Sequence, residues 1–259
     1  MQTITIEYKK DYAIIQLNRG KVNAIELEMV RELRKAFKDL EANESVRGVI
    51  LSGKPHYFSA GLDLVELYDY DEAKISSFWK EFLNLSTEMT KFSKPFVCAI
   101  TGHSPAGGCV LAITADYRVM TEGEKYKIGL NEVAVGIQLS PTIAALYAFW
   151  LGHRKASQYL LIGKMHSPQE ALECGLVDQI TNLEDVLPAA EKQLQKYLNA
   201  KTTVFKSAKL SIRKELIKQV DIDTNSVAEV NSAYWWSPES RMMLQMFIEN
   251  LKRKKTATA

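Results

Sequence analysis

Alternating apolar and polar positions open the chain and predict a β-hairpin. Residues 3–8 and 12–18 alternate, and a short polar segment joins them. Apolar residues then recur at helical spacing over residues 25–43 and 71–92, which predicts two amphipathic helices. A short apolar run before the second of these helices and another after it, at residues 46–52 and 96–100, predict buried strands.

Helical patterns dominate the second half of the chain. Further strands are predicted at residues 116–120 and 176–180, and helices at 141–151, 156–162, 167–174, 182–199, 202–220, 224–231 and from 237 onward. Strands interleaved with helices, followed by a helical last third, indicate an α/β layered core with a helical appendage. We expect the core to span residues 1–200 and the helical region residues 201–259.

Composition and charge exclude several classes of partner. The chain has 259 residues, 33 basic and 31 acidic, with a net charge of +2. This balance favours neither a nucleic-acid nor a membrane partner, and no apolar run reaches the roughly 18 residues of a membrane span. The three cysteines have no metal or disulfide spacing, and the N-terminus begins as a strand rather than as a targeting segment. A cytoplasmic protein is therefore expected.

The turn after the strand at 96–100 is the first candidate for chemistry. Ser104 can cap a helix and Pro105 suits a first helical position. Gly107 and Gly108 lack Cβ atoms, so a ligand can approach their backbone closely. Two interpretations stay open for this segment alone: an N–H site for a developing negative charge, or a tight turn in which glycine solves a packing problem.

A second loop of small residues, Ser59-Ala60-Gly61, follows the strand at 46–52. If the two loops meet, each can direct one backbone N–H at a single oxygen, as enolate-forming and acyl-transfer reactions require. A base is then needed. Glu132 lies among apolar and small neighbours, which would raise its pKa, although an ordinary loop glutamate is the alternative. His103 fits a turn or surface position better than a base.

Two segments resemble the oxyanion loops of one known family. Residues 58–64 (FSAGLDL) resemble the first such loop of the crotonase (enoyl-CoA hydratase/isomerase) superfamily, and residues 102–109 (GHSPAGGC) resemble the second. The resemblance runs from residues 18–25 to the C-terminal helix. It implies a crotonase spiral of ββα repeats with a helical C-terminal trimerisation region, and so a homotrimer or a dimer of trimers.

The resemblance also implies the site. Backbone N–H groups of Ala60 and Gly107 would hold the thioester oxygen of an acyl-CoA, and Glu132 would be the base. Coenzyme A would be part of the substrate, with no separate cofactor and no metal. The implied substrate-binding residues are Ala24, Ala60, Gly61, Leu62, Asp63, Leu64, Gly107 and Asn131. The basic run Lys252-Arg253-Lys254-Lys255 would contact CoA phosphate, or it is only a solvated helix end.

The reaction depends on which acids are present. Hydratases of this family use two glutamates, and Val110 stands at the position of the first. A dienoyl-CoA isomerase would want an aspartate where Ser140 stands. The remaining carboxyl, Glu132, suffices for a 1,3-proton shift, and segments 104–109, 128–132 and 175–179 resemble the mitochondrial-type Δ3,Δ2-enoyl-CoA isomerase branch. The expected activity is isomerisation of 3-enoyl-CoA to trans-2-enoyl-CoA in fatty-acid β-oxidation. Enoyl-CoA hydration or another crotonase-type reaction is the main alternative, followed by a non-catalytic acyl-CoA binding subunit.

Overall fold

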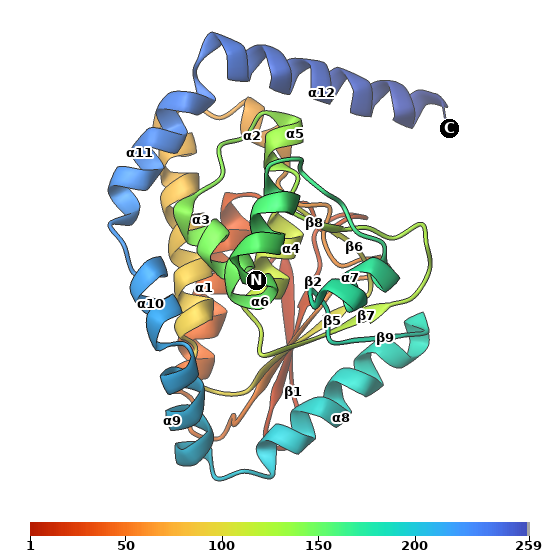
Figure 1. Cartoon of the computed structure of the whole chain (residues 1–259), viewed down its shortest axis with the longest axis vertical. Coiled ribbons are helices and arrows are strands. Elements are labelled where there is room, and N and C mark those ends of the chain that lie inside the picture. The colour runs from red at the N-terminus through yellow and green to blue at the C-terminus, as the bar shows by residue number, and fades with distance from the viewer. Residues whose placement is uncertain (258–259) are drawn as a thin grey trace.

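A six-stranded sheet forms the centre of the molecule (Figure 1). The computed structural model describes residues 1–257, without the side chains of Lys252 and residues 254–257. The strand order is β1-β2-β3-β5-β7-β9. Only β1 and β2 pair antiparallel, as the predicted hairpin, and the other neighbours are parallel. The strands are β1 (Ile4–Tyr8), β2 (Ala13–Leu17), β3 (Val49–Ser52), β5 (Phe96–Ile100), β7 (Tyr117–Thr121) and β9 (Gln179–Thr181).

A second, three-stranded sheet was not predicted from the sequence, and it contains the segment expected to be a turn after residues 96–100. Its parallel strands are β4 (His56–Tyr57), β6 (Gly102–Pro105) and β8 (Ile128–Gly129). The prediction that Ser104 caps a helix and Pro105 begins it is wrong. The Ser104 N–H donates to the Lys127 carbonyl at 2.9 Å, and Pro105 pairs with Gly129. Helix α4 (Gly107–Ile113) begins only after Ala106.

Helices cover both faces of the six-stranded sheet because successive strand residues point to opposite sides. Ile15 and Leu17 of β2 join the main core, whereas Ile14 between them packs in a smaller core. Helices α1 (Leu27–Ala42) and α3 (Glu72–Lys91) contribute to the main core, with Glu26 and Asp71 as their N-caps. Helix α8 (Val186–Leu198), after the 3₁₀ turn Leu183–Asp185, covers the other face (Figure 1).

The remaining helices follow the predicted order with two differences. Helix α6 (Pro141–Leu160) bends at Gly152, whose φ of 73° is left-handed, and α7 (Pro168–Cys174) ends at Gly175. The predicted helix at 202–220 is two helices, α9 (Thr202–Ile212) and α10 (Lys214–Val220), because Arg213 leaves the helical conformation. Helices α11 (Thr224–Trp235) and α12 (Pro238–Ala257) complete the chain. No helix in the described part of the chain is long and apolar enough to cross a membrane.

Buried charges attach this helical region to the core. The Arg213 guanidinium donates to the carbonyls of Thr90, Thr114 and Ala115 at 2.9–3.0 Å and pairs with Asp116 at 2.9 Å. Thr114 and Ala115 lie at the C-terminal end of α4, where carbonyls have no intrahelical partner. Arg213 therefore fixes the end of α4 opposite to the predicted oxyanion loop.

A second buried cation completes the attachment. Lys209 of α9 donates to Asp116 at 2.7 Å and to the Lys94 carbonyl at 2.9 Å. Burial lowers the pKa of Lys209 to about 8, and Asp116 opposes this shift. Asp116 thus balances two cations from the helical region, so removing either cation leaves buried polar groups unpaired.

We predict that Arg213→Met lowers the free energy of unfolding by about 3–5 kcal/mol, because it leaves three buried carbonyls and part of Asp116 without a partner. Chemical denaturation monitored by fluorescence measures this. The control, Lys218→Met on the neighbouring turn of α10, removes an exposed pair with Glu215 and should change stability little. Equal effects of the two variants would contradict the anchoring role.

Candidate active site

A cavity of about 610 Å³ brings the predicted site residues together. It lies among the loops after β3 and β5, the start of α4, helix α5 (Glu132–Val135) and the C-terminal helices. Of the predicted residues, seven side chains or backbones line it besides Glu132, and Gly61 lies just behind the lining. The seven are Ala24, Ala60, Leu62, Asp63, Leu64, Gly107 and Asn131.

The loop at residues 59–61 is held by hydrogen bonds to the segment at residues 19–24. Asn23, with a left-handed φ of 50°, donates from its amide to the carbonyls of Tyr57 and Phe58 at 3.2 and 3.1 Å. Ser59 donates from its hydroxyl to the Asn23 carbonyl at 2.7 Å, and the Gly61 N–H donates to that hydroxyl at 3.1 Å. Asparagine tolerates the left-handed conformation, so this sequence suits the turn.

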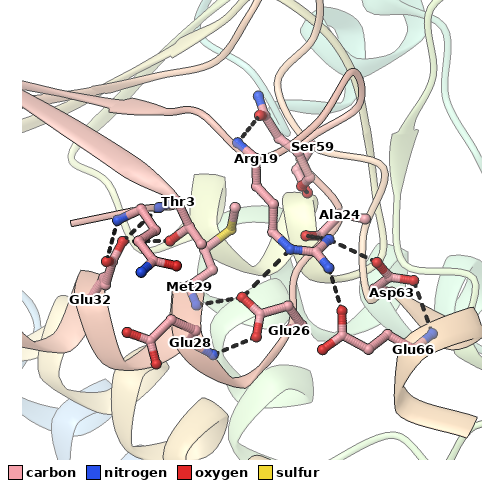
Figure 2. A network of polar contacts seen from close by, with 12 residues as sticks. Thr3, Arg19, Ala24, Glu26, Glu28, Met29, Glu32, Ser59, Asp63 and Glu66 are labelled. Atoms are coloured by element: carbon pink, nitrogen blue, oxygen red, sulfur yellow. Dashed lines mark hydrogen bonds and ion pairs between the residues drawn. The ribbon is translucent and has the colours of Figure 1, made fainter. Parts of the chain in front are cut away.

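Arg19 connects the same two segments through charge (Figure 2). Its guanidinium donates to the Ala24 carbonyl at 2.9 Å and to Asp63 at 2.7 Å, and it pairs with Glu26 and Glu66. Asp63 also accepts from the Glu66 N–H and so caps α2 (Leu64–Tyr68). Asp63 lines the cavity, but its carboxylate is already engaged, which makes it a support of the loop.

The prediction that the Ala60 N–H would donate to the thioester oxygen is wrong. The Ala60 N–H donates to the Val22 carbonyl at 2.8 Å and is not available to a ligand. The neighbouring Leu62 is different. The Ile25 N–H donates to the Gly61 carbonyl, and the Asp63 N–H donates to the Ile25 carbonyl, both at 2.8 Å. Leu62 lies between Gly61 and Asp63 in this parallel bridge, so its N–H points to the side away from Ile25. Within residues 1–257 the Leu62 N–H has no acceptor.

The Leu62 N–H and the Gly107 N–H lie beside each other. A Cβ added to Gly107 would stand 3.5 Å from the Leu62 nitrogen, and one added to Gly61 would stand 3.6 Å from the Gly107 nitrogen. The same Gly61 Cβ would meet the Pro105 carbonyl oxygen at 2.9 Å, and Gly61 has a left-handed φ of 82°. As the first residue of α4, Gly107 has an N–H without an intrahelical acceptor. The two loops therefore meet and present two unused donors.

Glu132 lines the same cavity as this pair of donors. It begins α5, is 7% exposed, and its Oε2 has no hydrogen-bond partner in the described structure. Burial raises the pKa of its carboxyl from 4.5 to about 7, slightly opposed by its own backbone N–H. The adjacent Asn131 Oδ1 and the Ser140 hydroxyl are also buried without partners. A poised acid and unpaired polar groups in one cavity are typical of a catalytic site.

Nearly the whole chain matches one known protein family. A profile described as enoyl-CoA hydratase/isomerase matches residues 7–256. The chain belongs to the enoyl-CoA hydratase/isomerase family.

Some relatives are named as isomerases and others as hydratases, the two activities in the family name. Enoyl-CoA delta isomerase 1, mitochondrial, from Mus musculus is 36% identical over 248 residues, covering 94% of this chain and 84% of that protein. The Homo sapiens protein of the same name is 34% identical over 256 residues, covering 94% and 81%. A probable enoyl-CoA hydratase from Rhizobium meliloti is 29% identical over 224 residues, covering 83% and 86%.

A solved structure confirms the fold. The crystal structure of human mitochondrial delta3-delta2-enoyl-CoA isomerase matches with a TM-score of 0.94 at 31% identity, covering 98% of this chain and 100% of that one. The expected crotonase-type α/β fold is therefore confirmed. The trimer and the boundary at residue 200 stay predictions.

Within this family fold, several cavity residues were not predicted. Ile143 comes from α6, Asn231 from α11, and Phe247 and Leu251 from α12. Helix α6 begins 80 residues after Gly61, and α11 and α12 begin more than 150 residues after it. Helical periodicity does not reveal that they close over a distant site. The aromatic residues of α3 divide: Trp79 and Phe82 line the cavity, whereas Phe78 is core.

Other predicted candidates lie outside the cavity. His103 accepts from the Lys127 N–H at 3.3 Å and packs on Tyr57 and Tyr126, and burial lowers the pKa of its imidazole. Val110 is buried in α4. Of the basic run at the C-terminus, only the side chain of Arg253 lies within the described residues. No cluster of His, Cys, Asp and Glu that could hold a metal is found among residues 1–257.

We predict that Glu132→Gln stabilises the protein at pH 8 by about 2–3 kcal/mol and by much less at pH 5. Between the unfolded pKa of 4.5 and the folded value of about 7, the folded state binds more protons, so wild-type stability falls as pH rises. Glutamine keeps the neutral form. Urea unfolding at both pH values measures the difference, with the exposed Glu215→Gln as control. A pH-independent difference would contradict the raised pKa.

Proposed function

We propose that this protein is a Δ3,Δ2-enoyl-CoA isomerase that moves the double bond of a 3-enoyl-CoA to the trans-2 position in fatty-acid β-oxidation. The observation that carries the proposal is the number of available acids. Two carboxyl groups line the cavity, and Asp63 is held by Arg19, which leaves Glu132. A 1,3-proton shift needs one group that takes and returns a proton, whereas hydration is served by two.

The reaction would proceed through a dienolate. The thioester oxygen would accept hydrogen bonds from the Leu62 and Gly107 N–H groups, and ionised Glu132 would remove a proton from C2. Negative charge would spread from C4 to the thioester oxygen, where two fixed donors stabilise it more than water does. The protonated Glu132 would then deliver the proton to C4, giving the trans-2-enoyl thioester and the ionised carboxylate again.

The surroundings of Glu132 support both halves of this cycle. With a pKa of about 7, the carboxyl is ionised in a useful fraction of molecules at neutral pH and also readily regains a proton. Apolar cavity residues, among them Val135, Ile137 and Ile143, limit water near the carboxyl. Water held beside a second acid would add to C3, and by the resemblance of the second loop Val110 stands where a hydratase of this family would have that acid.

Hydration of 2-enoyl-CoA is the second candidate, since the family includes hydratases. Hydration would need a second acid in addition to Glu132, and Asp63 cannot serve because Arg19 holds it. A non-catalytic acyl-CoA binding subunit is disfavoured because a buried carboxyl with a raised pKa destabilises the fold, and binding alone gives it no use. The high similarity to isomerases at 34–36% identity supports the first candidate over both.

We predict that wild-type protein isomerises 3-hexenoyl-CoA and hydrates crotonyl-CoA at least about 100-fold more slowly, while Glu132→Gln lowers isomerisation by about 1,000-fold or more. Formation and loss of the conjugated 2-enoyl thioester absorbance follow the two reactions. Glu215→Gln, an exposed exchange of the same kind on α10, should keep wild-type rates. Isomerisation that survives in Glu132→Gln, or comparable hydration by wild type, would overturn the proposal.

A further inference from the structure

One polar side chain lies in an otherwise apolar end of the cavity. Asn231 lines it together with Trp79, Phe82 and Leu83 of α3. Asn231 is 6% exposed, and its amide makes no hydrogen bond within the described residues. The indole Nε1–H of Trp79 is buried away from the cavity, so it does not compete with Asn231 for a bound ligand. Asn231 is thus the polar side chain that this part of the lining presents.

The position of Asn231 is fixed by the packing of α11 on α3. Trp235 follows Asn231 by one helical turn, so both lie on one face of α11. The Trp235 ring packs against that of Trp79 with centroids 5.9 Å apart. At the start of α11, Thr224 donates to the Asn84 side chain at 2.9 Å, and before it Thr87 donates to the Val220 carbonyl at 3.0 Å. These contacts hold Asn231 over the segment at residues 79–83.

This end of the cavity lies opposite to the loop that would hold CoA. Helices α3 and α11 run side by side on one side of α4, and strands β6 and β8 lie on its other side (Figure 1). Tyr57 belongs to β4, which pairs with β6 on this side, and Gly107 begins α4 between the helices and the strands; both residues line the cavity. A substrate whose thioester occupies the Leu62 and Gly107 donors would extend its acyl chain toward Asn231.

The Asn231 amide is not among the buried polar atoms that lack a partner, so it is open to the cavity, where water or a ligand oxygen can pair with it. A plain hydrocarbon tail would displace that water without replacing its hydrogen bond, whereas a ligand oxygen replaces it. The charge of the ligand is also restricted. Asp63 is held by Arg19, and no Lys or Arg is among the described lining residues, so an anionic tail would find no partner there.

We propose that the Asn231 amide recognises a neutral oxygen, as a hydroxyl or keto group, on the distal part of the acyl chain of the substrate. The preferred substrate class is therefore an oxygen-bearing 3-enoyl-CoA rather than a plain one. This inference rests on the proposed isomerase function. Asn231 touches the distal chain and sets specificity, while Glu132 carries out the proton transfer.

The test compares kcat/KM for unsaturated thioesters from 3-pentenoyl- to 3-decenoyl-CoA, each ending in a methyl, a hydroxyl or a carboxylate group. 3-Butenoyl-CoA serves as the shortest reference. The proteins are wild type, Asn231→Leu and, as a matched control, Asn225→Leu, which changes an exposed asparagine on the same helix. Thermal unfolding of each variant accompanies the kinetics.

For at least one chain length, wild type and Asn225→Leu should prefer the hydroxyl form over the methyl form by about tenfold or more, and the carboxylate form should be the poorest. Asn231→Leu should reverse the preference between hydroxyl and methyl, whereas Asn225→Leu should keep the wild-type turnover of 3-butenoyl-CoA. A methyl preference at every length in wild type, or an unchanged preference in Asn231→Leu, would overturn the inference. Failure to isomerise any thioester, including 3-butenoyl-CoA, would instead overturn the proposed function.

Discussion

The contact between two backbone turns is the constraint on which the rest of the site depends. Gly61 passes so close to Pro105 and Gly107 that a methyl group on either glycine would enter the space between them. This approach places the Leu62 and Gly107 N–H groups side by side. Each donor is fixed by a different sheet-to-helix connection, and neither uses a side chain. Donors held in this way need no reorganisation when negative charge develops on a bound oxygen, which is the advantage of a rigid fold over water.

Structural elements far from the cavity keep these turns in place. Arg19 and Asn23 hold the first turn from one side, through Asp63, Glu66 and the carbonyls of Tyr57 and Phe58. The second turn leads into α4, whose far end is bound by Arg213 of the C-terminal helical region. The same region supplies Asn231, Phe247 and Leu251 to the cavity wall. The C-terminal helices therefore bind the far end of α4 and also form part of the cavity wall.

Sequence patterns predicted the long elements and a buried Glu132 but missed the short strands. Five apolar residues in β5 or a 20-residue amphipathic α3 carry a strong local signal. Strands β4 and β8 have two residues each, too few for any periodicity, so the second sheet was not predicted. Ser104 and Pro105 have the residue types of a helix start, yet pairing with Lys127 and Gly129 places them in β6.

The donor at the first turn shows a second limit of sequence. Ala60 and Leu62 are two positions apart in the loop that resembles the first oxyanion loop of the family. The residue types in this loop do not show which backbone N–H is free. That choice is made by partners distant in sequence, Val22 for Ala60 and Ile25 on either side of Leu62. Glu132 was found because its apolar neighbours are local, whereas Asn231 was not found, because a polar residue in a late helix gives no sign that it enters the site.

In the proposed reaction Glu132 alone takes and returns the proton. Deuterium can be followed through a single turnover of 3-hexenoyl-CoA labelled at C2, with product analysed by mass spectrometry and NMR. Because Glu132 is buried, part of the label removed from C2 should appear at C4 of the trans-2 product. Complete replacement by solvent hydrogen at C4, together with residual turnover in Glu132→Gln, would show that a second acid delivers the proton.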